Sequence, residues 1–216
     1  MGKEQTCTIR VNGVARRSKA HLDSTSLRLS GLHRLTLPLA DVAEVHVTEE
    51  SLHLASAAGR IELELGRGIA EKWAHAITQP KSRLQKLSIR ADDRVCIRDL
   101  RDREFLAEIA AAVKTAPATA LRGAFDAIFQ GLDDPQGLTR LAQAKEHLVP
   151  AGALWLVHPK GKGSPVGEGA VRAAILAAGL YEAKVVAFSA THTATKAAIP
   201  LAARPMPASR RTAVRS

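Results

Sequence analysis

The chain has 216 residues, of which 46% are hydrophobic, and it carries a formal net charge of +10 at pH 7. A chain of this size can bury one sizeable core or two small ones, so one or two domains are expected. It holds no run of about 18 apolar residues to span a bilayer, and its first residues lack the apolar segment of a signal peptide. We therefore expect neither feature, and we expect a cytoplasmic protein.

The two cysteines argue against a metal centre and against a disulfide. Cys7 and Cys96 lie far apart in the sequence, and neither has a His or Cys partner at metal-ligand spacing. They fit two structural thiols in a reducing compartment, so no metal site is predicted.

The positive charge is unevenly distributed. Residues 1–80 contain 10 Lys and Arg against 9 Asp and Glu, whereas residues 81–216 contain 21 against 12. The net positive charge therefore lies almost entirely in the second half of the chain, and any function that depends on it is expected there.

Short segments of the first half alternate apolar with polar residues and are separated by turn-formers such as Asn12 and Gly13. Alternation with period two predicts consecutive antiparallel strands with one solvated face. About six strands are expected, with apolar cores at residues 8–11, 27–29, 35–37, 45–47, 52–54 and 61–65.

A change of apolar period marks the end of this first domain, residues 1–79. Ile69, Trp73 and Ile77 stand at helical spacing and predict one amphipathic helix before Pro80. Six or seven strands followed by a helix with a buried Trp resemble the pleckstrin-homology-like barrel, in which that helix plugs one open end. The resemblance covers roughly residues 5–79 and rests on pattern alone, so another small barrel or sandwich stays open.

One basic segment of this half is a candidate binding site. Arg16, Arg17 and Lys19 would lie in a loop between the first strands, a suitable place for a phosphate or an acidic peptide. Three cations in a nearly neutral half fit a solvated turn better. The histidines of this half share no ligand spacing and are expected at the surface: His21, His33, His46, His53 and His75.

After a cationic linker at residues 80–90, the pattern alternates between strand-like and helix-like segments. Such alternation favours a parallel sheet with helices on its faces, here over residues 91–203. The predicted strands are 95–97, 125–129 and 153–157, the predicted helices are 104–113, 136–147 and 168–178, and an edge hairpin is predicted from 181–189 and 195–201.

This order resembles the class I methyltransferase-like Rossmann fold. The stretch LVPAGALWL at residues 148–156 is similar to the turn Leu-x-Pro-Gly-Gly before that family's fifth strand, and Asp126 takes the acidic place in its fourth. The terminal hairpin matches its reversed seventh strand. More closely, KLSIRADDRVCIRDL and GALWLVHPKGKG resemble a family of small bacterial proteins with a degenerate form of this fold, over about residues 86–203. That resemblance implies no known activity.

In such a fold the cofactor is expected after the first strand, where glycines let the backbone approach it. Residues 95–105 contain no glycine, and residues 114–124 contain no carboxylate to hold ribose hydroxyls. We therefore expect no S-adenosylmethionine site and no other cofactor. The side chains that would occupy its place are Arg98, Asp99, Leu100 and Arg101.

The glycine-rich stretch at residues 158–169 is not a P-loop, because it follows the fifth strand and lacks the GxxxxGK[ST] order. The carboxyl edge of a parallel sheet gathers helix N-termini with their partial positive charge, and a helix is predicted to begin near Gly167. We expect a flexible turn with a weak anion site at His158, Lys160 and Lys162.

No catalytic constellation is evident, since the chain has no Gly-x-Ser-x-Gly elbow and no HExxH motif. His158, at the end of a central strand, is the best lone candidate for acid-base work, although a loop-capping role fits it better. His192 is interpreted as a polar turn residue. Asp133 and Asp134 are interpreted as caps of the helix that Pro135 begins, rather than as a metal pair.

Cations of the linker and of the tail, residues 204–216, could bind nucleic-acid phosphates or an acidic partner surface. The tail has no acid and no apolar periodicity, which predicts disorder in isolation. Aromatic residues make up only 3% of the chain, so specific base stacking is not favoured. The candidates are Lys81, Arg83, Lys86, Arg90, Arg204, Arg210, Arg211 and Arg215.

The sequence thus predicts an α+β barrel domain followed by an α/β methyltransferase-like domain without its cofactor site. The leading hypothesis is a non-catalytic scaffold or regulatory adaptor that binds another protein. Two alternatives stay open: an atypical S-adenosylmethionine-dependent methyltransferase acting on nucleic acid, and a nucleic-acid-binding accessory protein. A crevice surviving near Arg98 would favour the enzyme.

Overall fold

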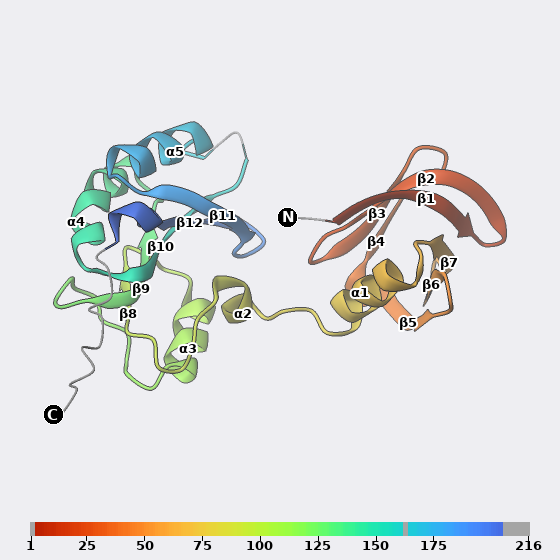
Figure 1. Cartoon of the computed structure of the whole chain (residues 1–216), viewed down its shortest axis with the longest axis horizontal. Coiled ribbons are helices and arrows are strands. Elements are labelled where there is room, and N and C mark those ends of the chain that lie inside the picture. The colour runs from red at the N-terminus through yellow and green to blue at the C-terminus, as the bar shows by residue number, and fades with distance from the viewer. Residues whose placement is uncertain (1–2, 162–163, 205–216) are drawn as a thin grey trace, which may run out of the picture. The chain divides into compact units, whose positions relative to one another are not determined.

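The computed structural model describes residues 3–161 and 164–204, and the chain divides into two compact units, residues 1–82 and 83–216 (Figure 1). Each unit has its own hydrophobic core. The division falls inside the predicted linker, whose later part forms helix α2 (Arg83–Leu87) of the second unit. None of the helices that the structure describes is long and apolar enough to cross a membrane.

The first unit is a seven-stranded antiparallel sheet, ordered β4-β3-β2-β1-β7-β6-β5, that curls into a nearly closed barrel (Figure 1). β1 is its central strand, because it pairs with β2 along its whole length and with β7 through residues 9–11. A short 3-10 turn, η1 (Leu39–Asp41), separates β4 from β5. The strands are β1 (Lys3–Val11), β2 (Val14–Leu22), β3 (Ser26–Ser30), β4 (Leu35–Pro38), β5 (Val42–Val47), β6 (Ser51–Ser56) and β7 (Gly59–Glu64).

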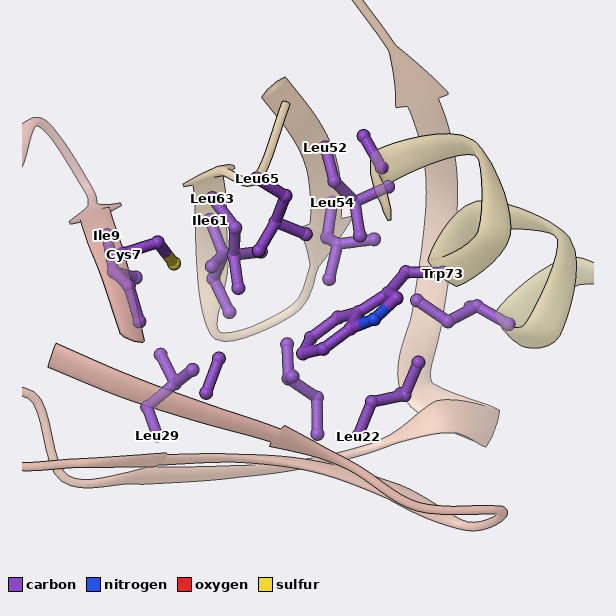
Figure 2. Close-up of a cluster of buried hydrophobic side chains, with 14 of the residues drawn as sticks. Cys7, Ile9, Leu22, Leu29, Leu52, Leu54, Ile61, Leu63, Leu65 and Trp73 are labelled. Carbon is purple, nitrogen blue, oxygen red and sulfur yellow. The ribbon is translucent and has the colours of Figure 1, made fainter. Parts of the chain in front are cut away.

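Helix α1 (Arg67–Thr78) completes the core of this unit. Its buried positions are Ala70, Trp73 and Ile77, the face that the apolar spacing predicted. The Trp73 side chain is only 1% exposed and lies among leucines from the strands, including Leu22 and Leu54 (Figure 2). The predicted arrangement of antiparallel strands followed by one packed helix is therefore present.

The predicted basic loop between the first strands is wrong. Asn12 and Gly13 have positive φ angles of 48° and 89° and join β1 directly to β2 in a two-residue turn. The three cations lie inside β2 and are exposed, whereas Ser18 between them is buried. Polar residues dominate this strand, so its alternation of buried and exposed positions is not evident in the sequence. The three cations are Arg16, Arg17 and Lys19.

The second unit contains a five-stranded sheet ordered β11-β12-β10-β9-β8 (Figure 1). β8 (Val95–Arg98), β9 (Phe125–Gly131) and β10 (Leu148–Pro159) are parallel. β12 (His192–Ala198) runs antiparallel to β10, and β11 (Tyr181–Ala187) runs antiparallel to β12 at the edge. The predicted parallel centre and terminal hairpin are both present.

Helices cover both faces of this sheet, which is why its central strands are apolar at successive positions. Helices α2 and α3 (Arg103–Ala112) pack with Trp155 and Val157 of β10. Helices α4 (Leu141–Glu146) and α5 (Glu168–Ala177) pack with Leu154 and Leu156, which point to the other face.

The predicted helix at residues 136–147 is divided into two parts. A 3-10 segment, η2 (Pro135–Arg140), precedes α4, and the Asp134 carboxylate accepts a hydrogen bond from the Gln136 amide at 2.8 Å. Asp134 thus caps the segment as predicted. The strand predicted to reach residue 201 ends earlier, at Ala198, and a short 3-10 turn, η3 (Leu201–Ala203), follows it.

Candidate ligand site at the carboxyl end of the parallel strands

The chain after β8 folds back onto the end of β9. Asp99 has a positive φ of 51°, a conformation that aspartate tolerates better than most residues. Its carbonyl oxygen lies so close to Gly131 that a Cβ at that position would be 1.9 Å away. Only glycine therefore fits at the end of β9, and the backbone of the β8–α3 loop lies directly against it.

A small polar network holds this loop in place. The Asp99 carboxylate accepts hydrogen bonds from Gln130 Nε2 and from Arg140 Nη1, each at 2.8 Å. Arg140 and Asp99 are about half exposed, so their ion pair contributes little by itself. Gln130 is only 1% exposed and also donates to the Gly131 carbonyl at 3.0 Å, so the buried amide fixes the position of Asp99.

Two hollows open on either side of this loop. The smaller, of about 320 Å³, lies between the ends of β8 and β9 and is lined by Asp99, Arg101, Gly131, Asp133, Asp134, Gln136, Gly137 and Arg140. The larger, of about 590 Å³, lies beside β8 and α3. We call it the β8 crevice; it is lined by Ile97, Arg98, Asp99, Leu100, Arg101, Leu106, Ala110, Pro117, Ala118 and Thr119.

A single residue lies beside β8 where a further parallel strand could pair. Ala118 donates its amide to the Val95 carbonyl and accepts from the Ile97 amide, both at 2.8 Å. This isolated bridge is parallel, and residues 114–124 form no strand. The segment covers the outer backbone edge of β8 and becomes one wall of the β8 crevice.

Arg98 lines the β8 crevice, and its charge has no partner among the residues that the structure describes. Its Nη1 atom is buried and donates to no hydrogen-bond acceptor in the described part of the chain. The guanidinium forms no described ion pair either, although the neighbouring Asp99 carboxylate is engaged by Gln130 and Arg140. A buried donor without a partner is costly, so pairing of this guanidinium with a ligand or with solvent would be favourable.

The described residues do not fit S-adenosylmethionine. No glycine lines the β8 crevice, and the side chains of Arg98 to Arg101 project from the loop that would have to wrap around the cofactor. No carboxylate lies in residues 114–124 to bind ribose hydroxyls. The expectation that the chain lacks a site for this cofactor stays a prediction.

His158 and Lys160 are both engaged by the chain itself. His158 is only 3% exposed, and its Nε2 lies 3.2 Å from the Thr195 hydroxyl. Burial lowers the pKa of His158, against the opposing effects of the Pro159 carbonyl and the Glu168 charge. Lys160 Nζ donates to the carbonyls of Ser189 and Ala190, at 2.6 and 3.3 Å.

The predicted anion site at His158, Lys160 and Lys162 stays a prediction, because Lys162 lies outside the described residues. The two described members already have partners within the β10–β12 region. His192, interpreted from the sequence as a turn residue, instead lies in β12 and contacts Asp133 Oδ1 at 3.2 Å.

The cations proposed for a partner surface have different surroundings. Arg83 is 18% exposed and binds Asp102 and Glu108 at 3.2 and 2.7 Å, so it is part of the second unit's packing. Arg204 donates to the Ile199 carbonyl at 3.0 Å. Lys81 and Arg90 are exposed, and Lys86 is half-buried. Arg210, Arg211 and Arg215 lie outside the described residues.

The first unit has its own hollow, of about 460 Å³, on the outer face of its sheet. His46 and His53 stack there with ring centroids 4.7 Å apart, and Arg10 binds Glu62 at 2.9 Å. Within the described ranges, no group of three or more His, Cys, Asp or Glu side chains could hold a metal ion. Both free cysteines are buried, and burial raises the pKa of each thiol.

The chain matches no protein-family model and no curated protein sequence. Among solved structures, it is similar to the N-terminal PH domain of human ARAP2, with 8% identity, 38% of this chain and 85% of that chain covered, and a TM-score of 0.28. A protein from Thermoplasma acidophilum assigned as a methyltransferase shows 9% identity, 93% and 99% coverage and a TM-score of 0.43. A methyltransferase from Pyrococcus furiosus shows 13% identity, 53% and 78% coverage and a TM-score of 0.36.

Proposed function

We propose that the protein is a non-catalytic scaffold or regulatory adaptor of the cytoplasm, whose second unit has a methyltransferase-like frame without an S-adenosylmethionine site. The observation that carries this proposal is the packing of Asp99 against Gly131. The loop that would have to receive a cofactor is bound to the end of the next strand instead, by Gln130 and Arg140.

Acid-base chemistry has little support among the described side chains. His158 is the best lone candidate from the sequence, but its ring contacts Thr195 and its pKa is lowered by burial. A general base needs a reacting proton within reach and a nucleophile beside it. The surface of the second unit offers a cation instead. Arg90 is exposed and forms no described ion pair, as binding to an acidic partner surface would require.

Calorimetric titration of the full-length protein with S-adenosylmethionine and with S-adenosylhomocysteine tests the loss of the cofactor site. We expect no heat of binding for either compound. A micromolar dissociation constant for either one would overturn the non-catalytic proposal.

Affinity capture tests the binding of a protein partner. The full chain and the variant Arg90→Gln should be used side by side on extracts of the native cells, followed by mass spectrometry. We expect the full chain to retain an acidic protein that higher salt releases, and we expect the variant to retain less of it. Equal capture by both chains at all salt concentrations would reject Arg90 as part of the partner surface.

An atypical methyltransferase acting on nucleic acid remains the second candidate, because the β8 crevice survives next to Arg98. The same titration decides it, since a methyltransferase must bind the methyl donor.

For a nucleic-acid-binding accessory protein, the logarithm of affinity should fall with the logarithm of salt concentration. Removing residues 205–216 should make that slope shallower, by roughly 0.7–0.9 for each phosphate that the tail neutralises. Unchanged binding after this truncation would remove the tail from any nucleic-acid site.

A further inference from the structure

We infer that the β8 crevice binds a small organic anion, with Arg98 holding its carboxylate or phosphate group and the apolar wall holding its hydrocarbon part. This inference does not depend on the adaptor function, because it concerns only the chemistry of the crevice. Its size, about 590 Å³, lies within the range of roughly 300–1,000 Å³ that is usual for small-molecule sites.

The charge of the crevice favours an anion. Arg98 and Arg101 both line it, and neither guanidinium has a described carboxylate partner. The one carboxylate on the lining, that of Asp99, already accepts hydrogen bonds from Gln130 and Arg140. Arg98 therefore brings to this hollow a positive charge without a described partner, and the exposed Arg101, which also lines the smaller hollow, adds a second cation to the lining.

The buried Nη1 atom of Arg98 identifies where the anion would be held. A guanidinium presents several N–H groups in a planar fork that matches the two oxygens of a carboxylate or phosphate. Nη1 is covered and unpaired in this structure, and the free energy that this costs would be recovered when the guanidinium turns toward an anion in the crevice. Arg98 stands at the end of β8, which pairs with β9, so the backbone that carries this side chain is fixed before a ligand arrives.

The remainder of the lining favours an apolar body over a sugar or a free inorganic ion. Leu100, Leu106 and Ala110 come from the loop and from α3, and Pro117 and Ala118 come from the segment that bridges to β8. The only uncharged polar side chain on this lining is that of Thr119. Burial of a hydrocarbon group against such a surface adds affinity in proportion to the apolar area removed from water.

Binding of defined probes to the full-length protein tests this inference. Phenyl phosphate and 4-phenylbutyrate carry both required parts, with different anionic groups. Inorganic phosphate carries only the anion, and phenyltrimethylammonium carries the apolar ring with the opposite charge. We expect the first two probes to bind at least about tenfold more tightly than the last two in calorimetric titrations, and the stronger of the two to identify the preferred anion.

Amide chemical shifts locate the site. With the preferred probe, the largest changes should fall at residues 97–101, 106, 110, 118 and 119. Changes centred on His158 and Lys160 would place the anion at the other predicted site and overturn the inference. Equal affinity for the cationic probe would overturn it as well.

Two matched pairs of variants test the named contacts. Arg98→Met should weaken the preferred probe by at least about tenfold, whereas Arg122→Met, at an exposed arginine outside the lining, should leave its affinity unchanged. Ala110→Phe should block the apolar wall and weaken the probe similarly, and Ala111→Phe, at the next exposed position of α3, should not. If Arg98→Met does not fold, the alanine pair decides alone. Equal affinities within both pairs, or within the alanine pair alone in that case, would reject the β8 crevice as the site.

Discussion

At the scale of single residues, Gly131 shows how the loop after β8 constrains the sheet. A methyl group at this position would meet the Asp99 carbonyl oxygen at 1.9 Å, and backbone cannot move aside as a flexible side chain can. We expect Gly131→Ala to destabilise the second unit by about 1–3 kcal/mol in chemical denaturation, through overpacking.

The control for this substitution is Gly169→Ala. Gly169 lies in α5 with no atom within 4 Å of the added methyl group, so alanine should raise stability, by up to about 1 kcal/mol. If Gly131→Ala were as stable as Gly169→Ala, the loop would not pack on β9 as described.

Asp23 is expected to make the stability of the first unit depend on pH. Burial would raise the pKa of this carboxyl group, but hydrogen bonds from the amides and hydroxyls of Thr25 and Ser26 outweigh it and lower the pKa to about 2. A carboxyl group with a lowered pKa in the folded state stabilises the fold above its unfolded pKa, and that contribution is lost as the pH falls.

For Asp23 the loss should therefore occur between about pH 4 and pH 2, and it should amount to about 2 kcal/mol at most. Asp23→Asn removes the titration but keeps an oxygen that can accept from the two amides. Urea denaturation of both proteins between pH 6 and pH 2 should show a steeper loss for the parent chain. Parallel curves would contradict the assignment.

At the scale of elements, Arg83 attaches helix α2 to helix α3. Its guanidinium binds Asp102, the N-cap of α3, and Glu108 in the body of that helix. It also lies 5.3 and 5.2 Å from the ring centroids of Phe105 and Phe188. The charge is thus held between two carboxylates and two aromatic rings of the same unit.

Arg83→Ala would leave the two carboxylates without their cation and the two rings without their cover. We expect a loss of about 2–3 kcal/mol in the stability of the second unit, measured by chemical denaturation. Arg90→Ala is the control and should change stability by less than about 0.5 kcal/mol, because Arg90 is exposed. Equal effects of both changes would show that the Arg83 contacts do not stabilise the unit.

At the scale of the whole molecule, two separate cores predict two unfolding events. The first unit's core is built around Trp73, and the second unit's cores lie on the two faces of its sheet. Calorimetry of the full chain should resolve two transitions. Trp73→Ala should lower one of them, at a cost of about 3–5 kcal/mol, and Arg83→Ala should lower the other.

A single transition that both substitutions shift would instead indicate one cooperative unit.

The boundary between the units also affects the stability of fragments of the chain. A second fragment that begins at residue 86 lacks Arg83, so it should be less stable than one that begins at residue 81.

The types of element and most of their places follow from local patterns in the amino-acid sequence. Period two against period 3.6 separated the strands of the first unit from α1, and the apolar runs of β9 and β10 indicated a covered parallel sheet. These signals are local, since they depend only on which face of an element is buried. The absence of glycine after β8 can also be seen directly in the sequence.

Which residues contact one another depends on how the elements pack. β2 was missed because polar residues dominate it, and it is held by its pairing with β1 rather than by an apolar period. Arg83 looked like a linker cation, but its partners stand 19 and 25 residues later. Likewise, nothing near Arg98 in the sequence shows that its guanidinium lacks a described partner or that a crevice opens beside it. Contacts between distant segments depend on how the elements pack, and a one-dimensional pattern does not encode that packing.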